Sequence, residues 1–112
     1  MTDLIRLRLE DSDGVVAMTP GQLLEAVLPE NAGTGYQWQV EPLPAGLELL
    51  GDRTAIGREA AGASGNRIFT VRVTGPGVFT ARLGRVWEPA ESARRTFTVK
   101  VVMERTDQAA VG

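Results

Sequence analysis

The sequence predicts an all-β fold, arranged as an antiparallel sandwich or barrel. Apolar residues recur at every second position in most segments, which is the pattern of half-buried strands. The 13 Gly and 6 Pro divide these segments into short pieces, and no long segment has a helical period. A chain of 112 residues buries enough surface for one core. We therefore expect a single domain over residues 1–104 and a flexible C-terminal tail at 105–112.

Four strands and a short apolar segment are predicted in the first half of the chain. In the first strand Ile5, Leu7 and Leu9 alternate with charged residues. The strands are expected at 5–10, 15–18, 22–28 and 36–41, with a loop at 29–35, and the short segment at 47–50. The apolar residues of the third strand also fit two helical turns, so the strand is the preferred of two interpretations there.

Three further strands are predicted in the second half, after a soft segment. Residues 53–65 are expected to form a mobile loop, because the small residues at 61–65 offer little to bury. Strands are expected at 67–73, 78–83 and 97–101. Gly75-Pro76-Gly77 is expected to join the first two of these as a tight hairpin.

The composition argues against most enzymes. The chain has no Cys and no His, so Cys–His and Ser–His–Asp catalysis are excluded and the two commonest zinc ligands are missing. Acid–base chemistry would fall to carboxylates, Lys100 or Tyr36. We expect no enzyme, no cofactor and no metal. The formal net charge of −2 argues against nucleic acid or an anionic membrane as the main partner.

The N-terminus has no signal-peptide pattern, and no run in the sequence approaches the roughly 20 apolar residues of a membrane-spanning helix. The sequence as printed therefore predicts a cytoplasmic protein without membrane insertion, and a leader preceding Met1 would place it in the periplasm or outside the cell. Nothing in the sequence demands more than a monomer.

Three motifs have a plainer explanation than the chemistry they suggest. Asp11-Ser12-Asp13-Gly14 resembles the start of a calcium loop, but the twelfth position is Gln22 where such a loop needs Glu, so an Asp-rich turn is favoured. Glu88 and Glu91 are expected to be solvated carboxylates and not a glycosidase pair. Gly62-Ala63-Ser64-Gly65 lacks the Lys and Ser/Thr of a phosphate-binding loop, so a flexible loop is expected.

Two other loops suggest binding. Asn31-Ala32-Gly33-Thr34-Gly35 can fold into a compact projecting turn, because Asn and Gly tolerate left-handed backbone. Arg85-Val86-Trp87-Glu88-Pro89 places Arg and Trp, two typical interface residues, in a loop. From the residues alone, Trp87 is either packed down or a binding anchor.

Three loops together resemble chagasin and its bacterial relatives, the inhibitors of papain-like cysteine proteases. Family members carry an Asn-Pro-Thr-Thr-Gly loop before an aromatic residue and a Trp, then a Gly-rich loop, then an Arg-Pro-Trp loop. The matching segments are Asn31-Ala32-Gly33-Thr34-Gly35-Tyr36-Gln37-Trp38, Gly62-Ala63-Ser64-Gly65 and Arg85-Val86-Trp87. Their order and spacing agree with the family from about Gly21 to Val102.

The resemblance implies an immunoglobulin-like sandwich with binding loops clustered at one end. It also implies reversible, non-covalent inhibition of a papain-like cysteine protease. The loop at 31–35 would enter the active cleft, while the loops at 62–65 and 85–89 would clamp it from either side. Ala32, Gly33 and Val86 depart from the family's Pro, Thr and Pro, and each change loosens the expected wedge. The alternative is a non-inhibitory protein-interaction module on the same sandwich.

Overall fold

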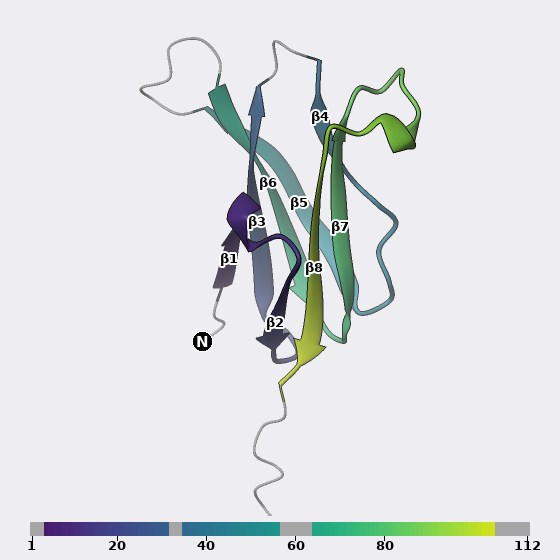
Figure 1. Cartoon of the computed structure of the whole chain (residues 1–112). Coiled ribbons are helices and arrows are strands. Elements are labelled where there is room, and N and C mark those ends of the chain that lie inside the picture. The colour runs from purple at the N-terminus through teal and green to yellow at the C-terminus, as the bar shows by residue number, and fades with distance from the viewer. Residues whose placement is uncertain (1–3, 32–34, 57–63, 105–112) are drawn as a thin grey trace, which may run out of the picture.

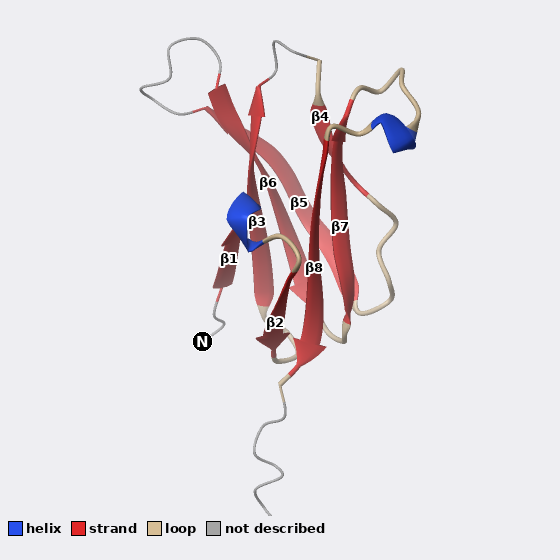
Figure 2. Ribbon diagram, viewed as in Figure 1, coloured by secondary structure: helices blue, strands red, loops and turns tan. Residues whose placement is uncertain are grey.

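The computed structural model describes residues 4–31, 35–56 and 64–104, which form two packed β-sheets (Figure 1, Figure 2). The strands in this part of the chain are β1 (Leu4–Arg8), β2 (Gly14–Met18), β3 (Leu23–Asn31), β4 (Gln37–Val40), β5 (Leu47–Ile56), β6 (Ser64–Val73), β7 (Gly77–Gly84) and β8 (Arg95–Met103). Within the described ranges, the short 3₁₀ helices η1 (Leu9–Asp11) and η3 (Ala90–Ser92) lie in connections. One sheet has the order β1-β3-β6-β5 and the other β2-β8-β7-β4.

The all-β sandwich prediction is confirmed, but the antiparallel prediction holds for only four of the six strand pairs in the described residues. At two edges, β1 pairs with β3 and β2 pairs with β8 in parallel. The reason is the connection between β1 and β2, which crosses through η1 from one sheet to the other and does not form a hairpin. Each edge strand therefore runs beside a strand that is distant in the sequence, where parallel pairing needs no tight turn.

The strands β3, β5 and β6 are longer than predicted. β5 and β6 pair out to Ile56 and Gly65, and β3 and β6 pair out to Asn31 and Ser64. The predicted loops are therefore wrong at 29–31, 53–56 and 64–65, while 57–63 lies outside the described residues, as does the predicted tail. Backbone pairing needs no apolar side chain, so small and polar residues continue these strands where side-chain patterns predict loops.

The Gly75-Pro76-Gly77 turn is not a hairpin, because β6 and β7 belong to different sheets. The turn crosses between the sheets and packs against the segment before β5, where the Gly46 carbonyl accepts hydrogen bonds from the N–H groups of Thr74 (2.8 Å) and Gly75 (3.2 Å). A Cβ on Gly46 would lie 2.7 Å from the Gly75 carbonyl carbon. This close approach of two backbones requires glycine.

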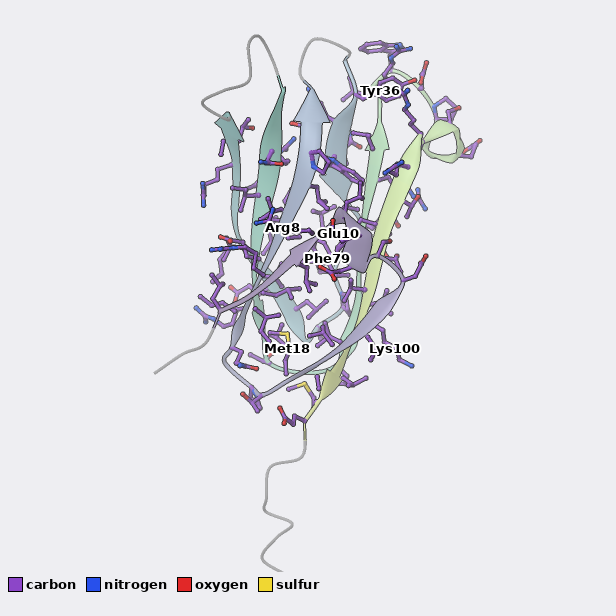
Figure 3. All side chains as sticks on the ribbon, turned by 60° about the vertical axis from the view of Figure 1, so that its left-hand side comes forward. Arg8, Glu10, Met18, Tyr36, Phe79 and Lys100 are labelled. Atoms are coloured by element: carbon purple, nitrogen blue, oxygen red, sulfur yellow. The ribbon has the colours of Figure 1, made fainter. Side chains whose placement is uncertain are left out.

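The core lies between the sheets and is dominated by aromatic rings. Phe79 is fully buried, and its ring centroid lies 6.3 Å from that of Phe69 and 6.2 Å from that of Phe97. Trp38 is 1% exposed and belongs to the same cluster. Figure 3 shows Tyr36 toward one end of the sandwich, with Met18 and Lys100 toward the other.

Within the described ranges, no helix has both the length and the apolar character needed to cross a membrane.

Replacing Phe79 with Ala is expected to lower the free energy of unfolding by about 3–5 kcal/mol, because it opens a cavity between two other rings. The neighbouring Val78, which is 47% exposed, provides a matched control, and Val78→Ala is expected to cost less than about 1 kcal/mol. Urea unfolding followed by circular dichroism measures both. Equal losses for the two variants would contradict the placement of the core.

Candidate functional site

One end of the sandwich collects three connections, which we call the loop end (Figure 1). They are the connections between β3 and β4, between β5 and β6, and between β7 and β8. The strand registers place the flanking residues side by side, with Asn31 opposite Ser64, Ile56 opposite Gly65, Gln37 opposite Gly84, and Leu83 opposite Arg95. The ends of strands that are far apart in the sequence therefore lie at the same end of the sandwich, where an immunoglobulin sandwich carries its binding loops.

The Tyr36 ring organises the β7–β8 connection against the start of β4. The Arg85 guanidinium carbon lies 4.3 Å from the Tyr36 centroid, and that of Arg94 lies 5.1 Å from it. Both distances fall within the range of a cation–π interaction. Arg85 also forms an ion pair of 3.5 Å with Glu88, whose N–H donates to the Arg85 carbonyl in a turn. The loop is thereby held at both ends by the same aromatic ring.

Trp87 projects from this loop, with 68% of its surface exposed, and the adjacent Val86 is 64% exposed. The Trp87 side chain is therefore not packed into the core, and its role as a binding anchor stays a prediction. An exposed Trp beside Arg is the composition of an interface hot spot. Its ring still has one close neighbour, since a Cβ on Gly35 would lie only 3.0 Å from Trp87 Cη2.

Gly35 has two reasons to be glycine. Its φ of +82° lies in the left-handed region, and the Trp87 ring occupies the space that a side chain would need. The β3–β4 and β7–β8 connections therefore touch at this residue. They form one surface at the loop end.

Below the β3–β4 connection lies a polar cluster formed by Glu30, Trp38, Arg67 and Asp52, which we call the clasp; it is buried at the Trp38 and Glu30 side chains and open to solvent at Asp52. Glu30 Oε2 accepts hydrogen bonds from the Trp38 backbone N–H (2.8 Å) and from Arg67 Nη1 (2.9 Å). Trp38 Nε1 donates to the Pro29 carbonyl at 2.8 Å. On its other side, the Arg67 guanidinium donates two hydrogen bonds to the Asp52 carboxylate.

The clasp shifts the ionisation of two of its members. The hydrogen bond from Arg67 lowers the pKa of Asp52, against a smaller opposing effect of burial. The hydrogen bond to Asp52, with the nearby Glu30 charge, raises the pKa of Arg67. Both shifts favour the charged forms, so the fold stabilises this ion pair.

A cavity of about 250 Å³ lies beside the β7–β8 connection, on the side of β4 and β7. Its lining includes the Glu41–Arg82 ion pair of 2.7 Å and the looser Arg85–Glu88 pair. The charges of the lining balance. Among the residues that the structure describes, no group of three or more acidic, His or Cys side chains is placed to hold a metal ion.

A model described as "Chagasin family peptidase inhibitor I42" matches residues 17–101 of the sequence. The chain belongs to the chagasin family of peptidase inhibitors. This confirms the family to which the sequence was compared and the prediction that the chain is not an enzyme. A comparison with curated proteins gives no match.

Solved structures share the fold of this chagasin-family chain. The cysteine protease inhibitor EhICP2 from Entamoeba histolytica has a TM-score of 0.80 at 20% identity, covering 90% of this chain and 96% of its own. Amebosin has a TM-score of 0.74 at 24% identity, covering 91% and 99%. PbICP-C, solved in complex with falcipain-2, has a TM-score of 0.62 at 15% identity, covering 93% and 92%.

The structure brings together part of the predicted site. Gly35, Tyr36, Arg85 and Trp87 are in contact or close to it, and Val86 is exposed beside them. Asn31 ends β3, while Ser64 and Gly65 belong to β6 and not to a loop, a correction to the predicted Gly-rich segment. Ala32, Gly33, Thr34, Gly62 and Ala63 lie outside the described residues.

The motif comparison missed Arg94 and the clasp. Of these residues, Glu30 was the easiest to predict from the sequence. It continues the alternation of the inward-facing Leu24, Ala26 and Leu28, and this pattern predicts a buried carboxylate. A buried carboxylate needs a partner, which would have directed attention to an arginine. No local signal connects Glu30 to Arg67, because the pairing depends on the register of β3 and β6.

Replacing Gly35 with Ala is expected to cost more stability than replacing Gly21. Gly21 has a similar φ of +92° but open space around it, so Gly21→Ala carries only the backbone strain of about 1–2 kcal/mol. Gly35→Ala must also displace the Trp87 ring. In a Trp87→Ala background the two losses, measured by urea unfolding, should become equal. An unchanged difference in that background would mean that the two loops are not in contact.

Replacing Asp52 with Asn is expected to lower stability in a pH-dependent way. Since the pKa of Asp52 is lowered in the folded state, its contribution is complete above the ordinary carboxyl range of about 4 and disappears as the pH falls through the lowered value. The difference in unfolding free energy between wild type and variant, measured from pH 2 to 7, should shrink toward the acidic end. Glu48→Gln, which breaks only a 3.7 Å surface pair, is the control and should change stability little at any pH.

Proposed function

We propose that the protein is a reversible, non-covalent inhibitor of papain-like cysteine proteases. The observation that carries the proposal is the exposed Trp87 held against Gly35 at the loop end of a chain from an inhibitor family. The structural neighbours EhICP2, a cysteine protease inhibitor, and PbICP-C, bound to falcipain-2, support the cysteine class of target. An inhibitor of this kind needs shape and rigidity and no nucleophile of its own, which agrees with the absence of Cys and His.

We assign the contact with the protease to three segments of one domain spanning residues 1–104. The segment 31–35, with Tyr36 behind it, enters the cleft, where the Thr34 hydroxyl and the Gly33 and Gly35 backbone make polar and close contacts. The segment 85–89 lies along one side, where Trp87 buries apolar area and Arg85 pairs or stacks at the rim. The segment 62–65 lies along the other side, with its Ser64 and Gly65 carried on β6.

Two features of the loop end favour tight binding without a large ordering cost. The cation–π contacts of Tyr36 with Arg85 and Arg94 and the packing of Trp87 on Gly35 exist before any partner arrives. Side chains already held in place lose less conformational freedom on association. Such preorganisation supports the assignment of 85–89 as a rigid side of the wedge.

The alternative, a non-inhibitory interaction module, draws on the departures from the family motif. Ala32 and Gly33 replace a rigid Pro and a hydroxyl-bearing Thr in the segment that would enter the cleft. A partner other than a protease would then use the same exposed Trp87. Inhibition measurements separate the two functions.

The wild-type protein is expected to inhibit papain and a cathepsin L-type protease reversibly in steady-state assays. Trp87→Ala should raise the inhibition constant by about 30-fold, equivalent to roughly 2 kcal/mol, because it removes the main apolar anchor. Thr34→Ala should weaken inhibition as well. Val15→Ala, at a position on β2 that is 66% exposed, is the matched control and should have no effect. Absence of inhibition by folded wild-type protein at tens of micromolar would favour the alternative.

A further inference from the structure

The β3–β4 connection crosses from one sheet to the other, so the end of β3 and the start of β4 must be held at a defined separation. Hydrogen bonding to β6 holds the end of β3 within its own sheet, and hydrogen bonding to β7 holds the start of β4 within the other. Neither ladder sets the separation between these two ends. Side-chain contacts across the gap must do so.

The clasp spans that gap. Glu30, the penultimate residue of β3, accepts a hydrogen bond from the Trp38 backbone N–H on β4, while the Trp38 ring N–H donates to Pro29 on β3. Two hydrogen bonds therefore close the connection at its base. The segment that the proposed function inserts into the protease cleft begins directly after Glu30 and ends shortly before Trp38.

The Glu30 carboxylate can hold this position only because Arg67 neutralises it. The Glu30 side chain is 7% exposed, and an unpaired carboxylate at that depth would be costly. Arg67 supplies the charge from β6, and Asp52 on β5 fixes the orientation of the guanidinium with two hydrogen bonds. Asp52 therefore orients Arg67, Arg67 neutralises Glu30, and Glu30 in turn holds the Trp38 backbone N–H.

We propose that Glu30 and Arg67 are positioning residues for inhibition, which set the separation and orientation of the two ends of the β3–β4 connection. The inference rests on the proposed function, and it adds residues outside the three loop motifs. Without the clasp, β3 and β4 keep their ladders, but the separation between the end of β3 and the start of β4 is less restricted. Each productive encounter with the protease then carries a larger ordering cost.

Glu30→Gln tests the proposal against a matched control on the same strand, Glu25→Gln. Glu25 is also buried, at 8% exposure, and pairs with Arg6 on β1 at 2.7 Å and with Arg53 on β5 at 3.7 Å, but it lies five residues before Glu30 and, within the described residues, makes no bond to β4. Both variants should lower the melting temperature. Only Glu30→Gln should raise the inhibition constant, by about tenfold, with Glu25→Gln within about twofold of wild type, both measured at 25 °C where each is folded.

Arg67→Lys provides a second variant in case Glu30→Gln does not fold. Lysine keeps the charge but lacks the planar fork that reaches Glu30 and Asp52 together, so inhibition should weaken although the net charge is unchanged. Nuclear magnetic resonance supplies a readout independent of any protease. The backbone amide of Trp38 should shift and exchange faster in Glu30→Gln and Arg67→Lys, and remain unchanged in Glu25→Gln.

The outcomes separate this inference from the proposed function. If the wild type inhibits and both clasp variants inhibit equally well, the positioning role is wrong and the inhibitory function stands. If Glu25→Gln weakens inhibition as much as Glu30→Gln, the effect is one of general stability, and the positioning role is again wrong. If the wild type does not inhibit, the proposed function fails, and the Trp38 amide comparison alone decides whether the clasp sets the geometry of the connection.

Discussion

Trp38 is the residue on which the loop end of this structure most depends. Its ring is part of the core between the sheets. The ring N–H donates a hydrogen bond to the Pro29 carbonyl near the end of β3, and the backbone N–H donates one to the Glu30 carboxylate. Apolar packing and polar contacts therefore act on the same side chain. Because β3 and β4 lie in different sheets, this residue links the two layers at the position where the chain crosses between them.

The loop end also explains how a chain without Cys or His can act on a protease. Arg85 and Arg94 contact Tyr36, and Trp87 rests on Gly35, so the exposed aromatic surface is ordered before binding. Recognition by a preformed surface requires no acid, base or nucleophile from the inhibitor. Under the proposed function, the cost of exposing Trp87 to solvent in the free protein is offset by the area that it would bury against a protease.

Much of the fold follows from the sequence, because alternating apolar residues such as Phe97, Val99 and Val101 define strands with one buried face. The parallel edge pairs and the sheet-crossing turn at Gly75 could not be predicted, since they depend on which strands become neighbours. The alternation of apolar residues also did not predict that β3 continues past Pro29. β1 ends at Arg8, opposite Val27, so β3 has a free edge there, and proline is tolerated at an edge.

The candidate site also has one part that the sequence predicts and another that it does not. Motif order located Gly35, Tyr36, Arg85 and Trp87 correctly at one end of the sandwich, whereas Ser64 and Gly65 belong to a strand whose small residues resemble a loop. The contact of Arg94 with Tyr36 and the ion pairs of Arg67 depend on the strand register and on the packing of segments that are distant in the sequence. A local pattern contains neither kind of information.

The departures from the family motif at Ala32 and Gly33 can be weighed against the contacts that hold the base and the side of the β3–β4 connection. In the family motif a Pro restricts the backbone and a Thr adds a hydroxyl, whereas this sequence has Ala32 and Gly33 at those positions. Its clasp and its Gly35–Trp87 contact lie outside the substituted positions and restrain the same connection from its base and from its side. Under the proposed function, contacts at the base and side of the connection offset these substitutions, and the strength of binding is expected to depend on Glu30, Arg67 and Trp38 as well as on the motif.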